Sequence, residues 1–209
     1  MQSILFLSCS PKGSGAVSLG FADEVVARLR QRHPQALVRT RDLSADPPRF
    51  VDAAFCSAIM DPGGGGPAAF HESETLIQEL EPAAAVVIAT PMHNFTVPSV
   101  LKAWIDQVVR IHRSFASTPA GKVGKLKDRP VFFVVASGGW FTGPSPTGSP
   151  AQPDFLTPYL TAVLNVIGLH DIHFMTLEGA TCGPELLERA VTLARQTLDQ
   201  LLPKGEAPR

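Results

Sequence analysis

Two unbroken apolar runs constrain the fold of this chain more than any other feature of its sequence. They comprise residues 83–89 and residues 130–136, and neither contains a charged side chain. A strand with one face in water alternates apolar and polar residues, whereas a strand buried on both faces is continuously apolar. Buried strands of this kind are typical of a parallel sheet that is covered by helices on both sides. We therefore expect both runs to be buried strands of an α/β protein.

Strands and helices alternate along the rest of the chain. Residues 3–8, 37–43 and 170–177 predict three more strands, and the second of these is charged and alternating, as edge strands tend to be. Helical periodicity predicts helices over residues 17–29, 71–80, 97–115, 154–168 and 184–201. Five strands that alternate with helices predict a doubly wound parallel sheet with helices on both faces. We expect one domain that spans residues 1–209.

Composition excludes several classes of protein. The chain has 209 residues, 44 % of them hydrophobic, and a formal net charge of −1, so no basic excess indicates a nucleic-acid partner. The apolar start at residues 4–7 is too short for a signal peptide or a membrane span, and we expect no membrane partner. Cys9, Cys56 and Cys182 are odd in number and scattered, which argues against a disulfide framework or a zinc site. We expect a cytoplasmic protein without a metal.

The loop after the first predicted strand has the composition of a phosphate-binding loop. It offers the hydroxyl groups of Ser10, Ser14 and Ser18 and the flexible positions Gly13 and Gly15, directly before a helix. Backbone N–H groups in such a loop, together with a helix amino terminus, bind phosphate without a cationic side chain. An ordinary strand-to-helix turn fits the same residues equally well.

Two more loops follow the apolar strands. Pro91 is expected to end the first strand, because proline has no N–H for the ladder, and Pro98 suits the first turn of the next helix. Between the two prolines lie the side chains of Met92, His93, Asn94 and Phe95. This mixture of a thioether, an imidazole, a carboxamide and a phenyl ring suits a flat aromatic ligand with a polar edge. The second strand runs into a paired-glycine turn at Gly138 and Gly139. Open α/β sheets bind ligands at the carboxyl ends of their strands.

The run PMHNFTVPSVLKAWID, which begins at Pro91, resembles a signature of the FMN-dependent NADH-azoreductases, a family of flavodoxin-like quinone reductases. The stretch DFLTPYL from residue 154, with the IGL and EG that follow it, is similar to the same family. His93 stands where the family more often has tyrosine. The resemblance implies a flavodoxin-like fold with strand order 2-1-3-4-5, so that the loops after strands one and three are neighbours.

The resemblance also implies where FMN would bind. The phosphate would lie at the first loop, where Ala16 replaces a frequent serine, and the ring would lie between the other two loops, where Ser137 replaces a frequent arginine. No side chain is expected to act as a catalytic acid or base, although His93 could supply a proton or serve only in packing and hydrogen bonding. The implied cofactor-binding residues are Ser10, Ala16, Val17, Ser18, Pro91, Met92, His93, Asn94, Phe95, Ser137, Gly138, Gly139 and Trp140.

The implied activity is that of a ping-pong oxidoreductase. NADH or NADPH would reduce FMN by hydride transfer, and the flavin would then reduce a quinone or an azo compound. The resemblance, and an apolar stripe of Ile111, Phe115, Tyr159 and Val163, predict a homodimer with the substrate cleft at the interface. Two alternatives stay open: a flavodoxin-like electron carrier or flavin-binding module, and a dehydrogenase that binds NAD at residues 13–18 and uses Asp42.

Two segments rich in glycine and proline have no periodicity. Residues 62–67 contain four consecutive glycines, which are too costly in conformational entropy for a regular element. We interpret them as a mobile connection, either a tolerated surface insertion or a flap over the substrate. Residues 142–153 predict a loop that could serve as a lid.

Overall fold

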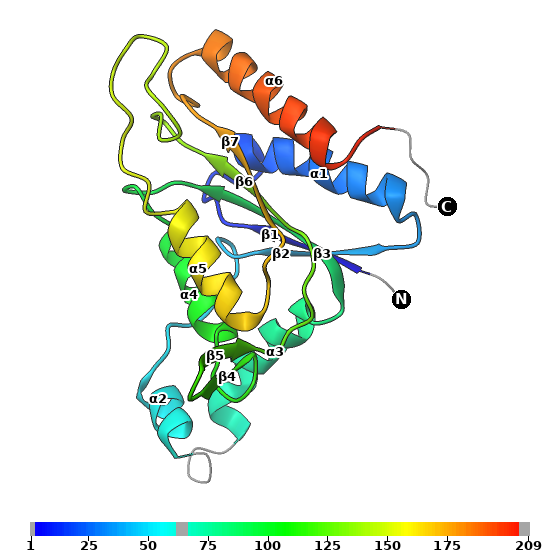
Figure 1. Ribbon diagram of the computed structural model, residues 1–209, viewed down its shortest axis with the longest axis vertical. Coiled ribbons are helices and arrows are strands. Elements are labelled where there is room, and N and C mark those ends of the chain that lie inside the picture. The colour runs from blue at the N-terminus through cyan, green and yellow to red at the C-terminus, as the bar shows by residue number, and fades with distance from the viewer. Residues whose placement is uncertain (1–2, 62–66, 205–209) are drawn as a thin grey trace.

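Five parallel strands form the central sheet in the computed structural model, which describes residues 3–61 and 67–204 (Figure 1). The order β2-β1-β3-β6-β7 is the predicted order 2-1-3-4-5 when only the parallel strands are counted, and the predicted flavodoxin-like α/β fold is confirmed. The bounds of these strands are β1 (Ser3–Ser8), β2 (Leu37–Asp42), β3 (Ala83–Pro91), β6 (Val131–Ala136) and β7 (Ile172–Leu177).

Helices cover both faces of the sheet (Figure 1). One face carries α1 (Val17–Arg32) and α6 (Pro184–Leu201), and the other carries α3 (His71–Leu80), α4 (Ser99–Val108) and α5 (Thr157–Ile167). The apolar run in β3 serves both cores, because its side chains alternate in direction. Val87 packs with α1 and α6, whereas Val86 and Ile88 pack with the other three helices. This double burial is the physical reason for the unbroken apolar pattern.

Two smaller elements lie below the sheet in Figure 1, away from the carboxyl ends of its strands. The first is an antiparallel hairpin of β4 (Phe115–Thr118) and β5 (Gly121–Gly124), and the second is helix α2 (Ala53–Met60). Helix α2 was not predicted, because the segment around it has weak periodicity. Asp52 starts this helix by accepting a hydrogen bond from the Phe55 N–H at 2.8 Å.

Helix α4 is shorter than the periodicity predicts. It ends at Val108 rather than near Phe115, so His112 and Phe115 do not extend its apolar stripe. Ser114 explains the stop, because its Oγ accepts from the Arg110 N–H (2.9 Å) and donates to the Val108 carbonyl (2.6 Å). A serine that bonds nearby backbone groups competes with the helical ladder. Phe115 instead enters β4 and is buried in the core of the protomer.

Smaller differences concern the ends of other elements. Strand β3 continues through Pro91, its last residue, and β7 begins two residues later than expected. Helix α5 begins at Thr157, because Asp154 Oδ1 accepts from the N–H groups of Leu156 and Thr157 at 2.9 Å. Gly168 follows its last turn with φ of +100°, as predicted. Most of the predicted mobile connection, residues 62–66, lies outside the described residues.

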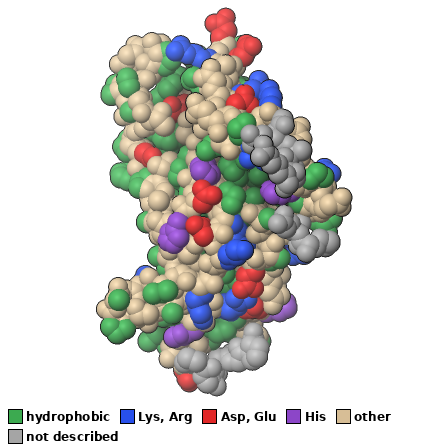
Figure 2. Space-filling model, turned by 45° about the vertical axis from the view of Figure 1, so that its right-hand side comes forward, with side chains coloured by type: hydrophobic (Ala, Val, Ile, Leu, Met, Phe, Trp, Pro, Cys, Tyr) green, Lys and Arg blue, Asp and Glu red, His purple; other side chains and the backbone are tan. Residues whose placement is uncertain are grey.

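Charged side chains on the side of the amino-terminal strand ends are paired rather than gathered by sign (Figure 2). Arg113 binds both Glu74 and Glu81, and the nearly buried Arg110 binds Glu74 at 2.6 Å. The hydrogen bonds from Arg113, with those from Arg110, lower the pKa of Glu74 to about 2. These contacts fasten α3 to the turn after α4. Within the described ranges, none of the helices is long and apolar enough to cross a membrane.

Candidate cofactor site

The loops after β1, β3 and β6 lie side by side at the carboxyl edge of the sheet. Strand pairing continues into them: the Cys9 N–H donates to the Ala89 carbonyl (2.9 Å), and the Met92 N–H donates to the Ala136 carbonyl (2.8 Å). The three groups of predicted site residues are therefore brought together, as the strand order required. This edge is the left side of the sheet in Figure 1.

The first loop presents the amino terminus of α1. Residues Gly13–Gly15 form one 3₁₀ turn, and Ala16 precedes the helix without giving it a side-chain cap, so far as the described residues go. The first N–H groups of a helix have no partner inside the helix. Ser18, in the first turn of α1, is 1 % exposed, and its hydroxyl has no hydrogen-bond partner within the ranges 3–61 and 67–204. Uncapped N–H groups beside an unpaired hydroxyl suit a phosphate.

The second loop is a tight two-residue turn. His93 and Thr96 exchange both backbone hydrogen bonds, at 2.9 and 3.0 Å. The two residues between them, Asn94 and Phe95, have φ of +48° and +68°, which makes the turn type I′. Asparagine tolerates this left-handed region, but an aromatic residue rarely occupies it. Backbone strain of this kind concentrates at functional sites, and here it leaves the Phe95 side chain 43 % exposed.

The third loop is closely packed on its own backbone. Ser137 is buried, and its Oγ accepts from the Gly139 N–H at 3.3 Å. A side chain at Gly139 would come within 2.6 Å of the Gln152 carboxamide oxygen, and one at Gly138 would come within 3.0 Å of the Thr181 hydroxyl. Both glycines therefore lie close to neighbouring side chains, which would have to move to make room for a larger residue. Ser137 keeps the backbone in place without the arginine that is frequent in the resembling family.

Trp140 points toward the other side of this loop. Its indole lies against Gly179, where an added Cβ would come within 2.5 Å of the ring. Together with Pro144, Leu186 and Arg189, it lines a hollow of about 290 Å³ between β7 and α6. The backbone of Trp140 still contacts the site, because its carbonyl accepts from the Gln152 N–H at 2.8 Å.

Sequence reasoning missed two residues that shape the site. Gln152 donates through Nε2 to Ser137 Oγ (3.0 Å) and to Met92 Sδ (3.4 Å). Glu178 accepts from the N–H groups of Phe141 (2.6 Å) and Thr142 (2.8 Å) and fixes the start of the long loop before α5. The EG pair gave a weak signal for Glu178. Nothing in the sequence around Gln152 indicated its contacts.

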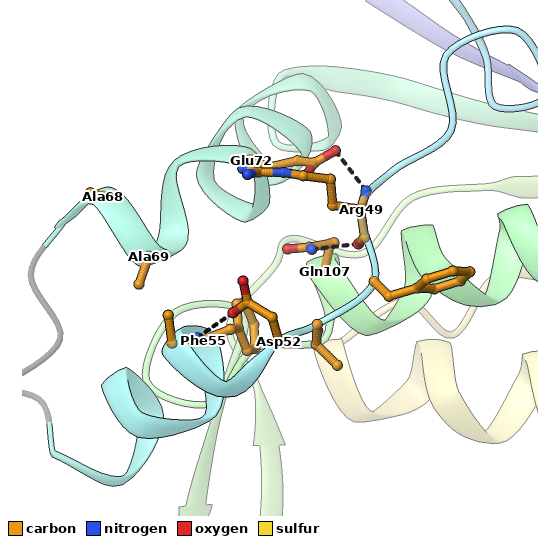
Figure 3. A pocket seen from close by; sticks show the side chains of 10 residues that line it. Arg49, Asp52, Phe55, Ala68, Ala69, Glu72 and Gln107 are labelled. Atoms are coloured by element: carbon orange, nitrogen blue, oxygen red, sulfur yellow. Dashed lines mark hydrogen bonds and ion pairs between the residues drawn. The ribbon is translucent and has the colours of Figure 1, made fainter.

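A separate hollow of about 350 Å³ lies where α2, α3 and α4 approach one another (Figure 3). Its polar groups are already paired with each other: Arg49 binds Glu72 at 2.9 Å, and Gln107 Nε2 donates to the Arg49 carbonyl at 2.8 Å. Asp52 is occupied by the start of α2. This hollow therefore offers few unpaired polar groups to a ligand and is not the candidate site.

The described part of the chain contains no group of three or more metal-ligating side chains. Cys9, Cys56 and Cys182 carry free thiols. Burial raises the pKa of the Cys9 thiol far above its usual range. The interpretation of residues 13–18 as an NAD site with Asp42 is not favoured. The sheet has the flavodoxin-like order, and Asp42 Oδ1 is engaged by the N–H groups of Ser44 and Ala45.

A parallel sheet of this order, with the uncapped amino terminus of α1 beside the loops after β3 and β6 at its carboxyl edge, defines a flavodoxin-like protein with a mononucleotide-type site. Comparison with known families agrees: the chain belongs to the family described by its flavodoxin-like fold, whose profile matches residues 2–202.

Similar proteins have been named in several bacteria. One from Pseudomonas fluorescens, FMN-dependent NADH:quinone oxidoreductase 4, is 46 % identical over 198 residues, which cover 95 % of this chain and 94 % of the relative. FMN-dependent NADH:quinone oxidoreductase 2 from Cupriavidus pinatubonensis is also 46 % identical, over 90 % of this chain and 92 % of its own length.

Solved structures share the fold. An azoreductase from Bacillus anthracis has a TM-score of 0.80 and 23 % identity, with 98 % of this chain and all of that chain covered. An FMN-dependent NADH-azoreductase from the same species, solved in complex with FMN, has a TM-score of 0.78 and 24 % identity over 97 % of this chain and all of that chain.

Proposed function

We propose that the protein is an FMN-dependent NADH:quinone oxidoreductase that also reduces azo compounds. The observation that carries this proposal is the 46 % identity, over nearly the whole chain, to proteins named for that activity. The structure supports it independently, because the site residues lie on three adjacent loops that fit one phosphate and one flat ring. The flavin, when bound, supplies hydride acceptance from the nicotinamide and hydride donation to the acceptor.

The residues of this chain would bind and orient the cofactor. The Ser18 hydroxyl and the N–H groups of Val17 and Ser18 would hold the phosphate, since none of them has a hydrogen-bond partner among the described residues. The turn at Asn94 would place a carboxamide donor at the polar edge of the ring, and the backbone near Gly139 would lie along the same edge. His93 has an exposed side chain without a hydrogen-bond partner in the described part of the chain, and no proton-transfer role is needed from it.

The cofactor is tested by its release. We expect the purified protein to be yellow and to release FMN on denaturation, because the amino terminus of α1 offers a site for one phosphate beside the loops proposed to hold the ring. Chromatography of the supernatant distinguishes FMN from FAD, and recovery of FAD alone would contradict the proposal. The bleached flavin spectrum should return when a quinone is added after NADH under nitrogen. A flavin that NADH does not bleach would favour the electron-carrier alternative, which the near-neutral charge also disfavours.

We propose further that the working form is a cytoplasmic homodimer with its cleft at the interface. Phe95 and Phe155 support this, because the Phe155 N–H donates to the Phe95 carbonyl (3.0 Å) and Phe155 is 61 % exposed. Tyr159 and Val163 continue this partly apolar surface along α5. Ile111 and Phe115 support it less than expected, because neither lies on α4 and Phe115 is in the core.

The dimer has a direct test. Sedimentation of the FMN-loaded protein at micromolar concentration should give twice the mass of one chain. A Phe155→Asp change at the proposed interface should shift the population toward monomer and lower quinone reduction, because a buried unpaired carboxylate is strongly unfavourable. Phe50 is also an exposed phenylalanine and lies near α2, so Phe50→Asp serves as the matched control. A fully active monomer would contradict the proposed interface.

A further inference from the structure

The carboxamide of Gln152 lies where the loops after β3 and β6 meet, although Gln152 belongs to the long loop before α5. Its Nε2 donates to Ser137 in the β6 loop (3.0 Å) and to the Met92 sulfur in the β3 loop (3.4 Å). Its backbone N–H donates to the Trp140 carbonyl at 2.8 Å. One residue therefore contacts both loops proposed to hold the flavin ring.

The other end of the carboxamide is packed on Gly139. A Cβ at Gly139 would lie 2.6 Å from Oε1 of Gln152 and 3.1 Å from its Cδ, so the amide lies directly against the glycine backbone. Ser137 Oγ accepts hydrogen bonds from both Gln152 Nε2 and the Gly139 N–H. The reverse amide orientation would place a carbonyl oxygen against the Met92 sulfur, which is itself an acceptor. Gln152, Ser137 and Gly139 form one connected unit.

Other residues also fix the long loop before α5 through hydrogen bonds, so Gln152 is not needed to keep the loop in place. Glu178 binds the N–H groups of Phe141 and Thr142 at its start. Near its end, the Phe155 N–H donates to the Phe95 carbonyl. With both ends of the loop fixed by these residues, the contacts of Gln152 act mainly on Met92 and Ser137.

We infer that Gln152 is a positioning residue for the flavin ring. It holds the loops after β3 and β6 at a fixed separation, so that the ring enters a preformed slot and no binding free energy is lost in ordering the loops. The inference rests on the proposed FMN binding. It assigns to the long loop a role in cofactor binding rather than that of a lid alone.

The test compares the affinities of two ligands that share the ring but not the phosphate. Apoprotein is titrated with FMN and with riboflavin, and the dissociation constant is measured from quenching of flavin fluorescence. Gln152→Met keeps an unbranched side chain of similar length but has no N–H donor. We expect it to raise both dissociation constants about tenfold, which corresponds to about 1.4 kcal/mol. Ser18→Ala, at the phosphate loop, should weaken FMN alone.

Two controls separate positioning from general damage. Gln196→Met makes the same chemical change on the exposed face of α6 and should leave both dissociation constants unchanged. Ser137→Ala removes the partner of Gln152, and the double variant should bind no more weakly than the weaker single variant, because residues in one hydrogen-bonded unit are not additive. The apoproteins of Gln152→Met and the wild type should have the same midpoint of thermal unfolding.

Each outcome decides the inference. Wild-type affinity of Gln152→Met for both ligands, or losses that simply add in the double variant, would overturn it while leaving the proposed function intact. A loss confined to FMN would also overturn it, because the residue would then act on the phosphate. If the wild-type apoprotein binds neither ligand, the proposed function fails and the inference fails with it.

Discussion

Replacing Arg129 by alanine is expected to lower the free energy of unfolding by about 3–4 kcal/mol. The Arg129 side chain is 7 % exposed and donates to four backbone carbonyls, those of Lys127, Leu80, Glu81 and Ala83, at 2.7 to 2.8 Å. It thereby joins the turn after α3 to the connection before β6. Removing the guanidinium takes a donor away from all four carbonyls, and those of Leu80 and Ala83 are in buried positions.

The size of the loss is limited by water. Arg129 borders a hollow of about 390 Å³ with Glu81 and Lys127, and water that enters it would pair some of the carbonyls. Without that hollow, four lost hydrogen bonds to a charged donor would cost more than most domains can tolerate. Arg129→Lys should recover about half of the loss, because one ammonium can reach several carbonyls but lacks the second nitrogen of the guanidinium fork.

Urea denaturation measures this effect. The midpoint should fall while the slope stays constant, since the native fold is unchanged. Arg39→Ala, on the exposed edge strand β2 and without an ion pair among the described residues, should change the stability by no more than about 0.5 kcal/mol. Equal midpoints for the two alanine variants would show that the carbonyls around Arg129 are satisfied in another way. Arg129 lies at the opposite edge from the site, so cofactor binding below the transition should be unaffected.

The fold could be predicted from sequence because its evidence is local. The apolar runs that became β3 and β6, the helical spacing in α1 and the proline at the start of α6 each report on their own segment. The strand order then places the loops at Ser10, Asn94 and Ser137 together without further information.

The sequence predicted helix bounds and contacts wrongly where side-chain hydrogen bonds override the periodicity of apolar residues. Ser114 stops α4 through bonds to residues four and six positions earlier, and no count of apolar residues registers them. Asp52 caps the amino terminus of helix α2, but the weak periodicity of the segment concealed this signal. Gln152 contacts Met92 across 60 positions from a segment with no pattern at all. Such long-range contacts depend on the folded structure and cannot be predicted from local sequence patterns.

The backbone conformation of Asn94 determines which substitutions can test its side chain. Asn94 is the first central residue of a type I′ turn with φ of +48°, and its carboxamide has no hydrogen-bond partner elsewhere in the described chain. An alanine there would add left-handed strain of about 1–2 kcal/mol to the loss of the donor. Glycine adopts the same φ freely, so Asn94→Gly removes the donor alone. Aspartate also tolerates this region and keeps the shape of the side chain.

Asn94→Asp is expected to lower the two-electron midpoint potential of the bound flavin by roughly 45–85 mV. An amide can donate to the polar edge of the ring, whereas a carboxylate can only accept. Two-electron reduction increases the negative charge at that edge, so the variant would lose a donor and gain a like charge there. A loss on the order of 2–4 kcal/mol in the reduced state follows from these two effects together. About 30 mV corresponds to 1.4 kcal/mol for a two-electron couple.

Potentiometric titration of the FMN-loaded variants measures the shift. Asn94→Gly should move the midpoint in the same direction by a smaller amount, because it loses the donor without adding a charge. The affinity for oxidised FMN should fall less than the affinity for the reduced cofactor, and reduction by NADH should slow in both variants. Asn165→Asp, the same chemical change near the carboxyl end of α5 and away from the site, should leave the midpoint unchanged. If Asn94→Asp binds FMN with the wild-type midpoint, Asn94 serves only to form the turn, since asparagine and aspartate share that capacity and differ only in what they offer the ring.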